Sequence, residues 1–287
     1  MAQININGMQ LEYREGGEGE PLVFVHGSAS DLRTWQYQQD FFSNYFRTVV
    51  YSRRYHWPNE SIPEAADYSM FEHVDDLEQI LNTFGTEPVH LVGHSYGAIV
   101  CLLLAFQVPE KIQTLVLAEP PVITLFVSNK PKPLELLRLM FTRPRTAVSI
   151  MKLGAKGFGP ASKAAEQDKL EEASAIFGKV ILGTEFYNKL SEARIEQINI
   201  NTIKAEFLGS GYPPISPEKI SRVQIPTLLI NGEKSPAVFY RLMDRVEELL
   251  PNAERIKIPQ SSHIMHEDNA PEFNKRVLNF LERDKKA

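Results

Sequence analysis

The chain has 287 residues, of which 43% are hydrophobic, with a formal net charge of −5 and a single cysteine. This length fits one α/β domain with an insertion. The mild negative charge gives no electrostatic case for nucleic acid or an anionic membrane as a partner, and the lone Cys101 excludes an intrachain disulfide framework. No run is long enough to span a bilayer and no targeting segment is evident, so we expect a cytoplasmic protein.

The first part of the chain alternates predicted strands and helices. Segments 3–6 and 9–14 form a predicted hairpin with an Asn-Gly turn, and the apolar runs 22–25 and 46–51 predict two further strands. Segment 69–84 carries its apolar residues on one stripe, which predicts a helix. The alternation indicates a mostly parallel sheet covered by helices on both faces, with ligands binding beyond the carboxyl ends of its strands.

The pentapeptide Gly93-His94-Ser95-Tyr96-Gly97 is the strongest chemical signal in the chain. It lies between two apolar runs, 89–92 and 98–104, and this context predicts a strand, a sharp turn and a helix. A G-x-S-x-G sequence in that position is a nucleophile elbow, which holds the serine hydroxyl clear of the sheet. The glycines are needed because the strained turn leaves little room for side chains. Ser95 is therefore the predicted nucleophile.

A serine nucleophile needs a base to accept its proton and a third group to orient that base. His263 is the predicted base, since it follows a strand-like run at 254–258 and precedes a predicted helix over 270–283. It should lie on a loop at the carboxyl end of a strand. The chain order of nucleophile, acid and histidine is the order expected of the α/β-hydrolase arrangement.

The predicted oxyanion hole consists of two backbone N–H groups. One belongs to Tyr96, the residue after the nucleophile, and the other to Ser28, in the loop after the 22–25 strand. Losing one such donor typically raises the barrier by about 2.7–4 kcal/mol.

The strand–helix alternation stops between residues 122 and 217. This region contains turns and three predicted amphipathic helices, over 133–141, 163–182 and 186–198. We interpret it as a helical cap inserted over the catalytic serine. Residues 1–121 and 218–287 would then form the core.

The chain resembles the single-domain, capped serine hydrolases of the α/β-hydrolase fold superfamily. The resemblance rests on His26-Gly27, the pentapeptide around Ser95, the segment 228–233 and Ser262-His263, which span nearly the whole chain in the right order. It implies an α/β-hydrolase fold, with a mostly parallel central sheet flanked by helices and an inserted helical cap.

The acid of the triad departs from the pattern common in this family. Many such hydrolases carry G-x-x-D at this point, but here Ser235 stands where the aspartate would fall after Gly232. One hypothesis places the acid at Glu119, directly after the apolar strand 115–118, and the other at Glu233. We favour Glu119, because a carboxylate at a buried strand end needs a partner.

These parts predict hydrolysis of a carboxylic ester or lactone of a small, largely apolar substrate through an acyl-enzyme, with no metal or cofactor. Carbon–carbon bond hydrolysis, cofactor-free perhydrolysis and ligand sensing with a hydrolase-like pocket remain alternatives. Haloalkane dehalogenases and epoxide hydrolases of this fold are similar elsewhere, but they use an aspartate at the elbow, where this chain has Ser95.

Three further residues are candidates for the substrate pocket. His56 and Trp57 follow the 46–51 strand, and Phe126 opens the predicted cap. His26 and His94 belong to the motifs but are expected to hold loop shape rather than transfer protons. The oligomeric state is not predicted.

Overall fold

The structure is a computed structural model that describes residues 2–64, 66–85, 87–201 and 203–284. In this part of the chain one sheet has the strand order β1-β2-β4-β3-β5-β6-β7-β8. The strands are β1 (Ala2–Ile6), β2 (Met9–Gly16), β3 (Pro21–Val25), β4 (Arg47–Tyr51), β5 (Val89–His94), β6 (Ile112–Ala118), β7 (Thr227–Gly232) and β8 (Ala253–Ile258).

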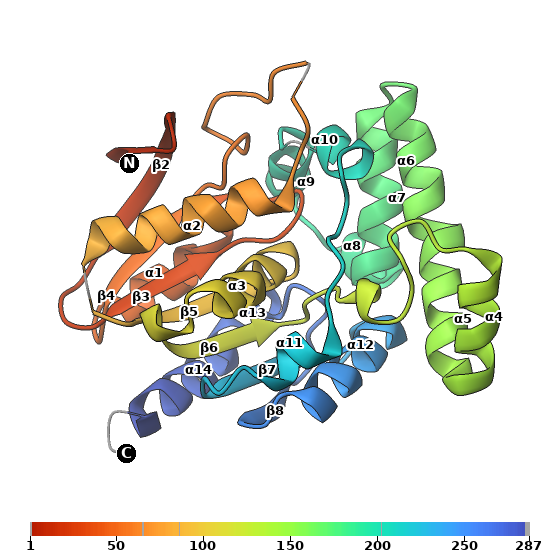
Figure 1. The fold of residues 1–287 in the computed structure, drawn as a ribbon. Helices are drawn as coiled ribbons and strands as arrows, with labels where there is room; N and C mark the ends of the chain where they lie inside the picture. The colour runs from red at the N-terminus through yellow and green to blue at the C-terminus, as the bar shows by residue number, and fades with distance from the viewer. Residues whose placement is uncertain (1, 65, 86, 202, 285–287) are drawn as a thin grey trace.

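The sheet is parallel from β4 to β8, and only the β1–β2 hairpin and the β2–β4 pair are antiparallel. The parallel strands therefore all end at one edge, where the loops after β3, β5, β6 and β8 meet (Figure 1). The expected α/β-hydrolase architecture, a mostly parallel central sheet flanked by helices, is confirmed.

The two faces of the sheet are covered by different helices. Alternate residues of each strand point to opposite faces, so Val23 and Val25 of β3 join one core cluster while Leu22 and Phe24 join the other. The first face packs against α2 (Met70–Phe84), α3 (Tyr96–Gln107) and α12 (Ala237–Leu249), and the second against α1 (Gln36–Phe42), α13 (Met265–Asp268) and α14 (Ala270–Asp284) (Figure 1).

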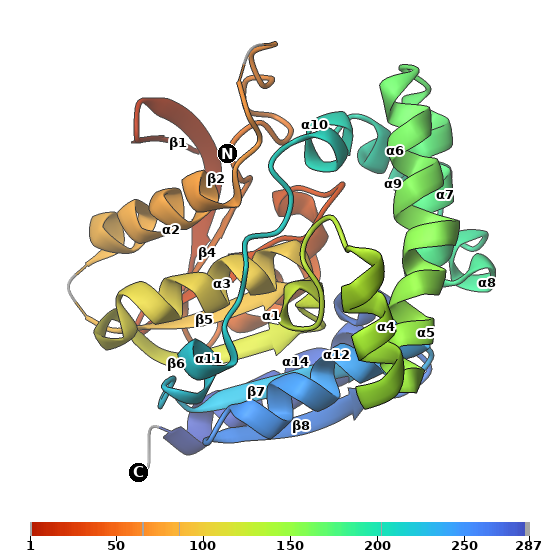
Figure 2. The same ribbon diagram turned by 45° about the vertical axis from the view of Figure 1, so that its right-hand side comes forward.

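Between β6 and β7 the described chain is largely helical, and its part from α4 to α10 lies beyond the carboxyl edge of the sheet (Figure 2). Its helices are α4 (Pro133–Thr142), α5 (Pro144–Leu153), α6 (Gly159–Glu166), α7 (Leu170–Leu182), α8 (Thr184–Tyr187), α9 (Glu192–Asn199) and α10 (Ile203–Leu208), with a π-helical turn at Gly154–Phe158. A short helix, α11 (Pro217–Ser221), leads back to β7. We call the region from α4 to α10 the cap.

The helix expected over 133–141 is present as α4, but the two longer helices expected in the cap are each divided. Asp168 has a φ of +58°, a left-handed conformation that ends α6 before α7 begins. Ser191 caps α9 by accepting a hydrogen bond from the N–H of Arg194 at 3.2 Å, which separates α9 from α8. Both breaks depend on local backbone geometry that apolar periodicity does not record.

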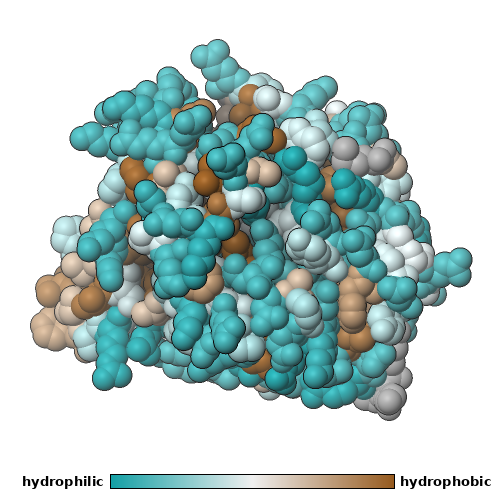
Figure 3. Space-filling view, turned by 180° about the vertical axis from the view of Figure 1, so that it is seen from behind, coloured by the Kyte–Doolittle hydropathy of each residue, from teal (hydrophilic) through white to brown (hydrophobic). Residues whose placement is uncertain are grey.

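The surface seen from behind is mainly hydrophilic, with hydrophobic residues in small scattered groups (Figure 3). None of the helices in the described part of the chain has the length and apolar character that crossing a bilayer requires.

Candidate active site

Three of the residues predicted for catalysis and oxyanion binding line a common cavity. Ser28 follows β3, Ser95 follows β5 and His263 lies on the loop after β8, and all three contact a cavity of about 60 Å³. Because these strands are parallel, their carboxyl ends bring side chains that are far apart in sequence to one edge of the sheet. We call this space the catalytic cavity.

The backbone at Ser95 has the strained geometry of a nucleophile elbow. Its φ is +51°, in the left-handed region that residues with side chains rarely adopt. The flanking glycines have a steric reason to be there: a Cβ on Gly93 would lie 2.6 Å from the Cα of Ala98, and one on Gly97 would overlap the carbonyl oxygen of Val25. The close approach of β3, β5 and α3 thus depends on both glycines.

Glu119 and His263 form a buried hydrogen-bonded pair. The Nδ1 of His263 lies 2.6 Å from Oε2 of Glu119, and both side chains are almost completely buried. The ring of Phe239 stacks on the imidazole with centroids 3.9 Å apart. The Nε2 of His263 is buried and has no hydrogen-bond partner within the described residues. One ring nitrogen is therefore anchored to the carboxylate, and the other is left available.

The carboxylate of Glu119 is surrounded by hydrogen-bond donors. Oε1 accepts from the side-chain amide of Asn231 at 2.8 Å and from the N–H of Gly232 at 3.1 Å, and Oε2 accepts from Ser235 Oγ at 3.0 Å. Arg255 donates to Asn231 Oδ1 at 2.8 Å, which fixes the amide with its NH₂ toward Glu119. Ser235, which stands where the resemblance led us to expect an aspartate, is thus a donor to the carboxylate that follows the neighbouring strand.

The other candidate acid, Glu233, lies away from this pair. Its side chain is 44% exposed, and its Oε2 accepts from the N–H of Gln260 at 2.8 Å. Within the described residues the structure brings Glu119, not Glu233, to His263.

Burial acts on both partners of the pair. It lowers the pKa of the His263 imidazole, because the charged form loses its hydration. It raises the pKa of the Glu119 carboxyl, and the hydrogen bonds from Asn231, Ser235 and Gly232 oppose that rise. The imidazole is consequently neutral at neutral pH, the form in which it can accept a proton.

The loop that carries Ser28 is held by charged and aromatic side chains. Arg53, which follows β4 and is fully buried, donates to the carbonyl oxygens of His26 at 3.1 Å and Gly27 at 2.9 Å. Its guanidinium also lies 4.4 Å from the ring centroid of Tyr96. Neither the N–H of Ser28 nor that of Tyr96 donates a hydrogen bond within the described residues. Arg53 therefore contacts residues at both predicted oxyanion donors: the carbonyl groups just before Ser28 and the side-chain ring of Tyr96.

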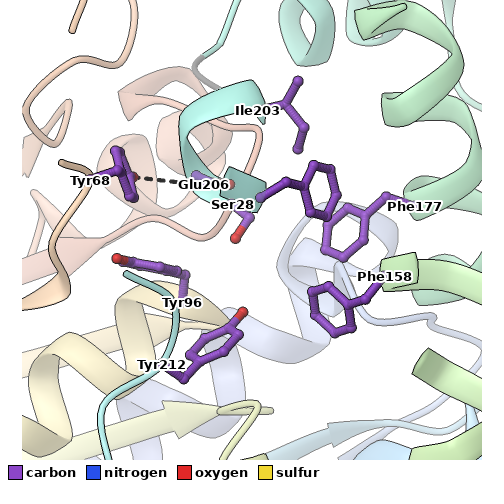
Figure 4. Close-up of a pocket in the computed structure, with 10 residues that line it drawn as sticks. Ser28, Tyr68, Tyr96, Phe158, Phe177, Ile203, Glu206 and Tyr212 are labelled. Carbon is purple, nitrogen blue, oxygen red and sulfur yellow. Dashed lines mark hydrogen bonds between the residues drawn. The ribbon is translucent and has the colours of Figure 1, made fainter. Parts of the chain in front are cut away.

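A cap residue completes this arrangement. Glu206 of α10 pairs with Arg53 at 3.1 Å, accepts from Tyr68 OH at 3.1 Å and accepts from the N–H of Ala29 at 3.3 Å (Figure 4). Burial alone would raise the pKa of Glu206, but its hydrogen bond to His56 and the charges of His56 and Arg53 lower it to about 2. The carboxylate is therefore ionised and ties α10 to the loop of residues 26–29, which we call the oxyanion loop after the role predicted for Ser28.

His26 and His94 both hold loops in place. His94 Nε2 donates to the carbonyl oxygen of His263 at 2.8 Å, and His26 Nε2 accepts from the N–H of Arg53 at 2.9 Å. Burial lowers the pKa of both imidazoles, so both are neutral at neutral pH.

The three pocket candidates from the sequence do not line the catalytic cavity. His56 is fully buried, with its ring bonded to the carbonyl oxygen of Ser30 at 2.8 Å and to Tyr68 OH at 2.7 Å. The ring of Trp57 is covered by the guanidinium of Arg33, 3.6 Å from its centroid, and Phe126 packs against the larger core cluster. A position after a strand, or at the start of the cap, was not sufficient to predict a place in the cavity, because each of these side chains packs against other residues.

The supporting roles of Arg53, Glu206, Asn231 and Phe239 were not predicted from the sequence. Arg53 and Asn231 carried a usable signal, as polar residues at the ends of apolar strands. The cap residues that line the catalytic cavity, among them Phe177, Ile181 and Arg194, lie on predicted helices whose orientation the sequence left open.

Comparison with known proteins shows the family of the chain. The family model described as alpha/beta hydrolase fold matches residues 20–270. The chain belongs to this family. A curated relative, the "Uncharacterized hydrolase YraK" of Bacillus subtilis, is 25% identical over 99% of this chain and 96% of its own length. Epoxide hydrolase 3 of Xenopus tropicalis is 25% identical over 97% of this chain and 76% of its own length.

Solved structures share the fold over the whole chain. An epoxide hydrolase from Bacillus megaterium superposes with a TM-score of 0.74 at 22% identity, covering 98% of this chain and 100% of its own. Est816, described as an N-acyl homoserine lactone degrading enzyme, superposes with a TM-score of 0.69 at 19% identity, covering 97% and 100%. The family and these relatives support a hydrolase of the α/β fold.

Proposed function

We propose that this hydrolase cleaves a carboxylic ester or lactone of a small, largely apolar substrate through an acyl-enzyme intermediate. The observation that carries the proposal is the pair of Glu119 and His263, whose free Nε2 belongs to a residue lining the same cavity as Ser95. A hydroxyl, an oriented imidazole and a buried carboxylate are the groups that acyl transfer requires.

In the proposed reaction the Ser95 hydroxyl attacks the acyl carbonyl while His263 Nε2 takes its proton. Glu119 keeps the proton of His263 on Nδ1 and stabilises the imidazolium that forms. The N–H groups of Ser28 and Tyr96 bind the oxyanion. His263 then protonates the leaving alkoxide, activates water to attack the acyl-enzyme, and returns the proton to Ser95 as the acid is released.

The elbow residue separates this proposal from the chemistry named for several relatives. Epoxide hydrolases of the fold use an aspartate there, whose own carbonyl is attacked when the alkyl-ester intermediate is hydrolysed. Ser95 has no such carbonyl, so acyl transfer fits the site better than epoxide opening. The lactone-degrading neighbour and a thermophilic esterase from Thermogutta terrifontis, with a TM-score of 0.71 at 21% identity, belong to the class that we propose.

The test compares the unaltered protein with Ser95→Ala. We expect a fluorophosphonate probe to label the unaltered protein at Ser95, and we expect Ser95→Ala to lose at least about a thousandfold in kcat for p-nitrophenyl acetate. Thermal unfolding should show that the variant is folded. Turnover retained by Ser95→Ala, or no labelling of the folded unaltered protein, would remove Ser95 as the nucleophile.

A further inference from the structure

The catalytic cavity is too small to hold a whole substrate. It measures about 60 Å³, and a second chamber, which adjoins it at Ser28 and Phe177, measures about 20 Å³. Sites that enclose organic ligands typically measure about 300–1,000 Å³. The space next to Ser95 therefore suits the reacting acyl group, and the rest of the substrate must bind elsewhere.

A larger groove lies in the cap. It measures about 720 Å³ and is lined by residues of α4, α5, α6 and α10, together with the segments that precede α4 and follow α10. Many of its lining residues are apolar, among them Leu136, Ile150, Leu153, Phe158, Phe207 and Leu208. We call it the cap groove. Its size lies within the range of ligand sites, and its apolar lining favours hydrocarbon over charged groups.

The cap groove leads toward Ser95. It shares Phe158, Glu206, Phe207, Gly211 and Tyr212 with the small chamber, so only a layer of side chains separates the two spaces. The chamber in turn shares two residues with the catalytic cavity. The three spaces thus adjoin one another in the order groove, chamber and catalytic cavity.

Aromatic rings form much of that layer. The ring centroid of Phe158 lies 6.2 Å from that of Phe207 and 6.4 Å from that of Tyr212, in edge-on contacts. Figure 4 shows Phe158 on the cap side of the chamber, with Tyr96 and Tyr212 on the other side. Side-chain rotation is enough to separate such rings, whereas moving a backbone wall would disturb the fold.

Glu206 is the charged residue among those shared by the groove and the chamber, and it does not need a charged ligand as its partner. Glu206 lines both the groove and the chamber, but its carboxylate is already paired with Arg53 and accepts from Tyr68 and the N–H of Ala29. The charge there is balanced before any substrate binds. An apolar chain can therefore pass without leaving a buried charge unpaired.

We propose that the cap groove binds the apolar part of the substrate, and that the substrate is an ester or lactone with an unbranched alkyl chain that passes between Phe158 and Tyr212 to reach Ser95. This rests on the proposed function and adds the class of substrate to it. Each buried methylene then improves binding about fourfold.

Two positions on α5 offer a matched test. Met151 lines the cap groove and is 46% exposed, whereas Val148, one turn earlier, is 55% exposed and does not line it. Both positions have room at the surface for a larger side chain, so Met151→Trp and Val148→Trp should both fold. Leu136→Trp, at a less exposed position that also lines the groove, is the second blocking variant.

The experiment measures kcat/KM for p-nitrophenyl esters from acetate to decanoate and for alkyl acetates from ethyl to decyl. We expect at least one series to rise by about tenfold or more with chain length. Met151→Trp and Leu136→Trp should remove most of that rise, while Val148→Trp, which lies outside the groove, should keep both the rise and the activity on p-nitrophenyl acetate. A flat profile in both series, or a rise that both blocking variants retain, would overturn the proposal.

A binding measurement separates this inference from the proposed function. Hexyl acetate is titrated calorimetrically into the Ser95→Ala protein and into Ser95→Ala/Met151→Trp. Binding to the first that is lost in the second supports the groove even if the unaltered protein hydrolyses no ester, in which case only the catalytic proposal fails. Equal binding to both proteins, or no binding to either, counts against the groove.

Discussion

The Glu119–His263 pair and the oxyanion loop lie at the same edge of the sheet, but they are held in different ways. Glu119 and His263 are braced within the core, by Asn231, Ser235 and Phe239. The oxyanion loop is braced by Arg53, whose charge is balanced by Glu206 of the cap. Changes in the cap should therefore affect oxyanion binding much more than they affect the orientation and pKa of the His263 imidazole.

The two arrangements also differ in their energetics. The carboxylate of Glu119 is satisfied by neutral donors and the imidazole, whereas Arg53 and Glu206 form a fully buried ion pair. Removing one partner of a buried ion pair leaves an uncompensated charge and costs about 3–5 kcal/mol. Loss of a single charge should therefore lower the free energy of unfolding more at the Arg53–Glu206 pair, between core and cap, than at the Glu119–His263 pair.

The largest expected effect concerns the core arrangement. Glu119→Gln removes the carboxylate that sets the tautomer of His263 and should reduce kcat for p-nitrophenyl acetate by about 10³- to 10⁴-fold. Glu233→Gln is the matched control and should stay within about threefold, because Glu233 is half-exposed and bonded to a backbone N–H. A severe loss in Glu233→Gln alone would show that the acid has been assigned to the wrong strand end.

A smaller effect is expected where the cap meets the core. Glu206→Gln keeps the shape of the side chain but leaves Arg53 without its counter-charge, and should lower the free energy of unfolding by about 3 kcal/mol. We also expect kcat to fall about tenfold through the oxyanion loop. Glu172→Gln, at an exposed position on α7, is the control and should change neither quantity measurably.

The stability difference should depend on pH. The pKa of Glu206 is lowered from its ordinary value of 4.5 to about 2 in the folded protein. Its contribution to stability is then complete above the unfolded pKa and lost as the pH falls from about 4.5 to about 2. Urea unfolding of the unaltered protein and Glu206→Gln across this range should converge at low pH. A constant difference would mean that the pair does not stabilise the fold through its charge.

A smaller effect concerns the pH profile of kcat/KM, whose fall on the acid side should be shifted to lower pH. His263 must be neutral to accept the proton of Ser95, and burial lowers its pKa below the ordinary value of 6.5. The profile of kcat/KM should therefore fall only at a pH below 6.5. Glu206→Gln should leave the midpoint in place, since in the described part of the chain the imidazole is hydrogen-bonded to Glu119 and stacked on Phe239, both outside the cap. A midpoint that moves in this variant would contradict the separation of the two arrangements.

Sequence reasoning was most effective where a motif carries its own steric reason. The elbow around Ser95 is recognisable because Gly93 and Gly97 are required wherever a strand, a turn and a helix approach so closely. It was less effective for the acid, because Glu119 and Glu233 both follow apolar strands and a linear pattern does not say which way a side chain turns. It was least effective for the pocket, where His56, Trp57 and Phe126 pack elsewhere.

The alternation of strands and helices, the helical region after β6 and the elbow turn at Ser95 could be predicted from the sequence, because they depend on local periodicity and turn geometry. That Glu119 meets His263, and that Glu206 of the cap neutralises Arg53, became visible only in the folded chain, where the registers of β6 with β7 and of β7 with β8 bring the loops after β6 and β8 to one edge. Both outcomes depend on contacts between residues more than a hundred positions apart, and the energy of such contacts is set by packing and burial that no local pattern contains.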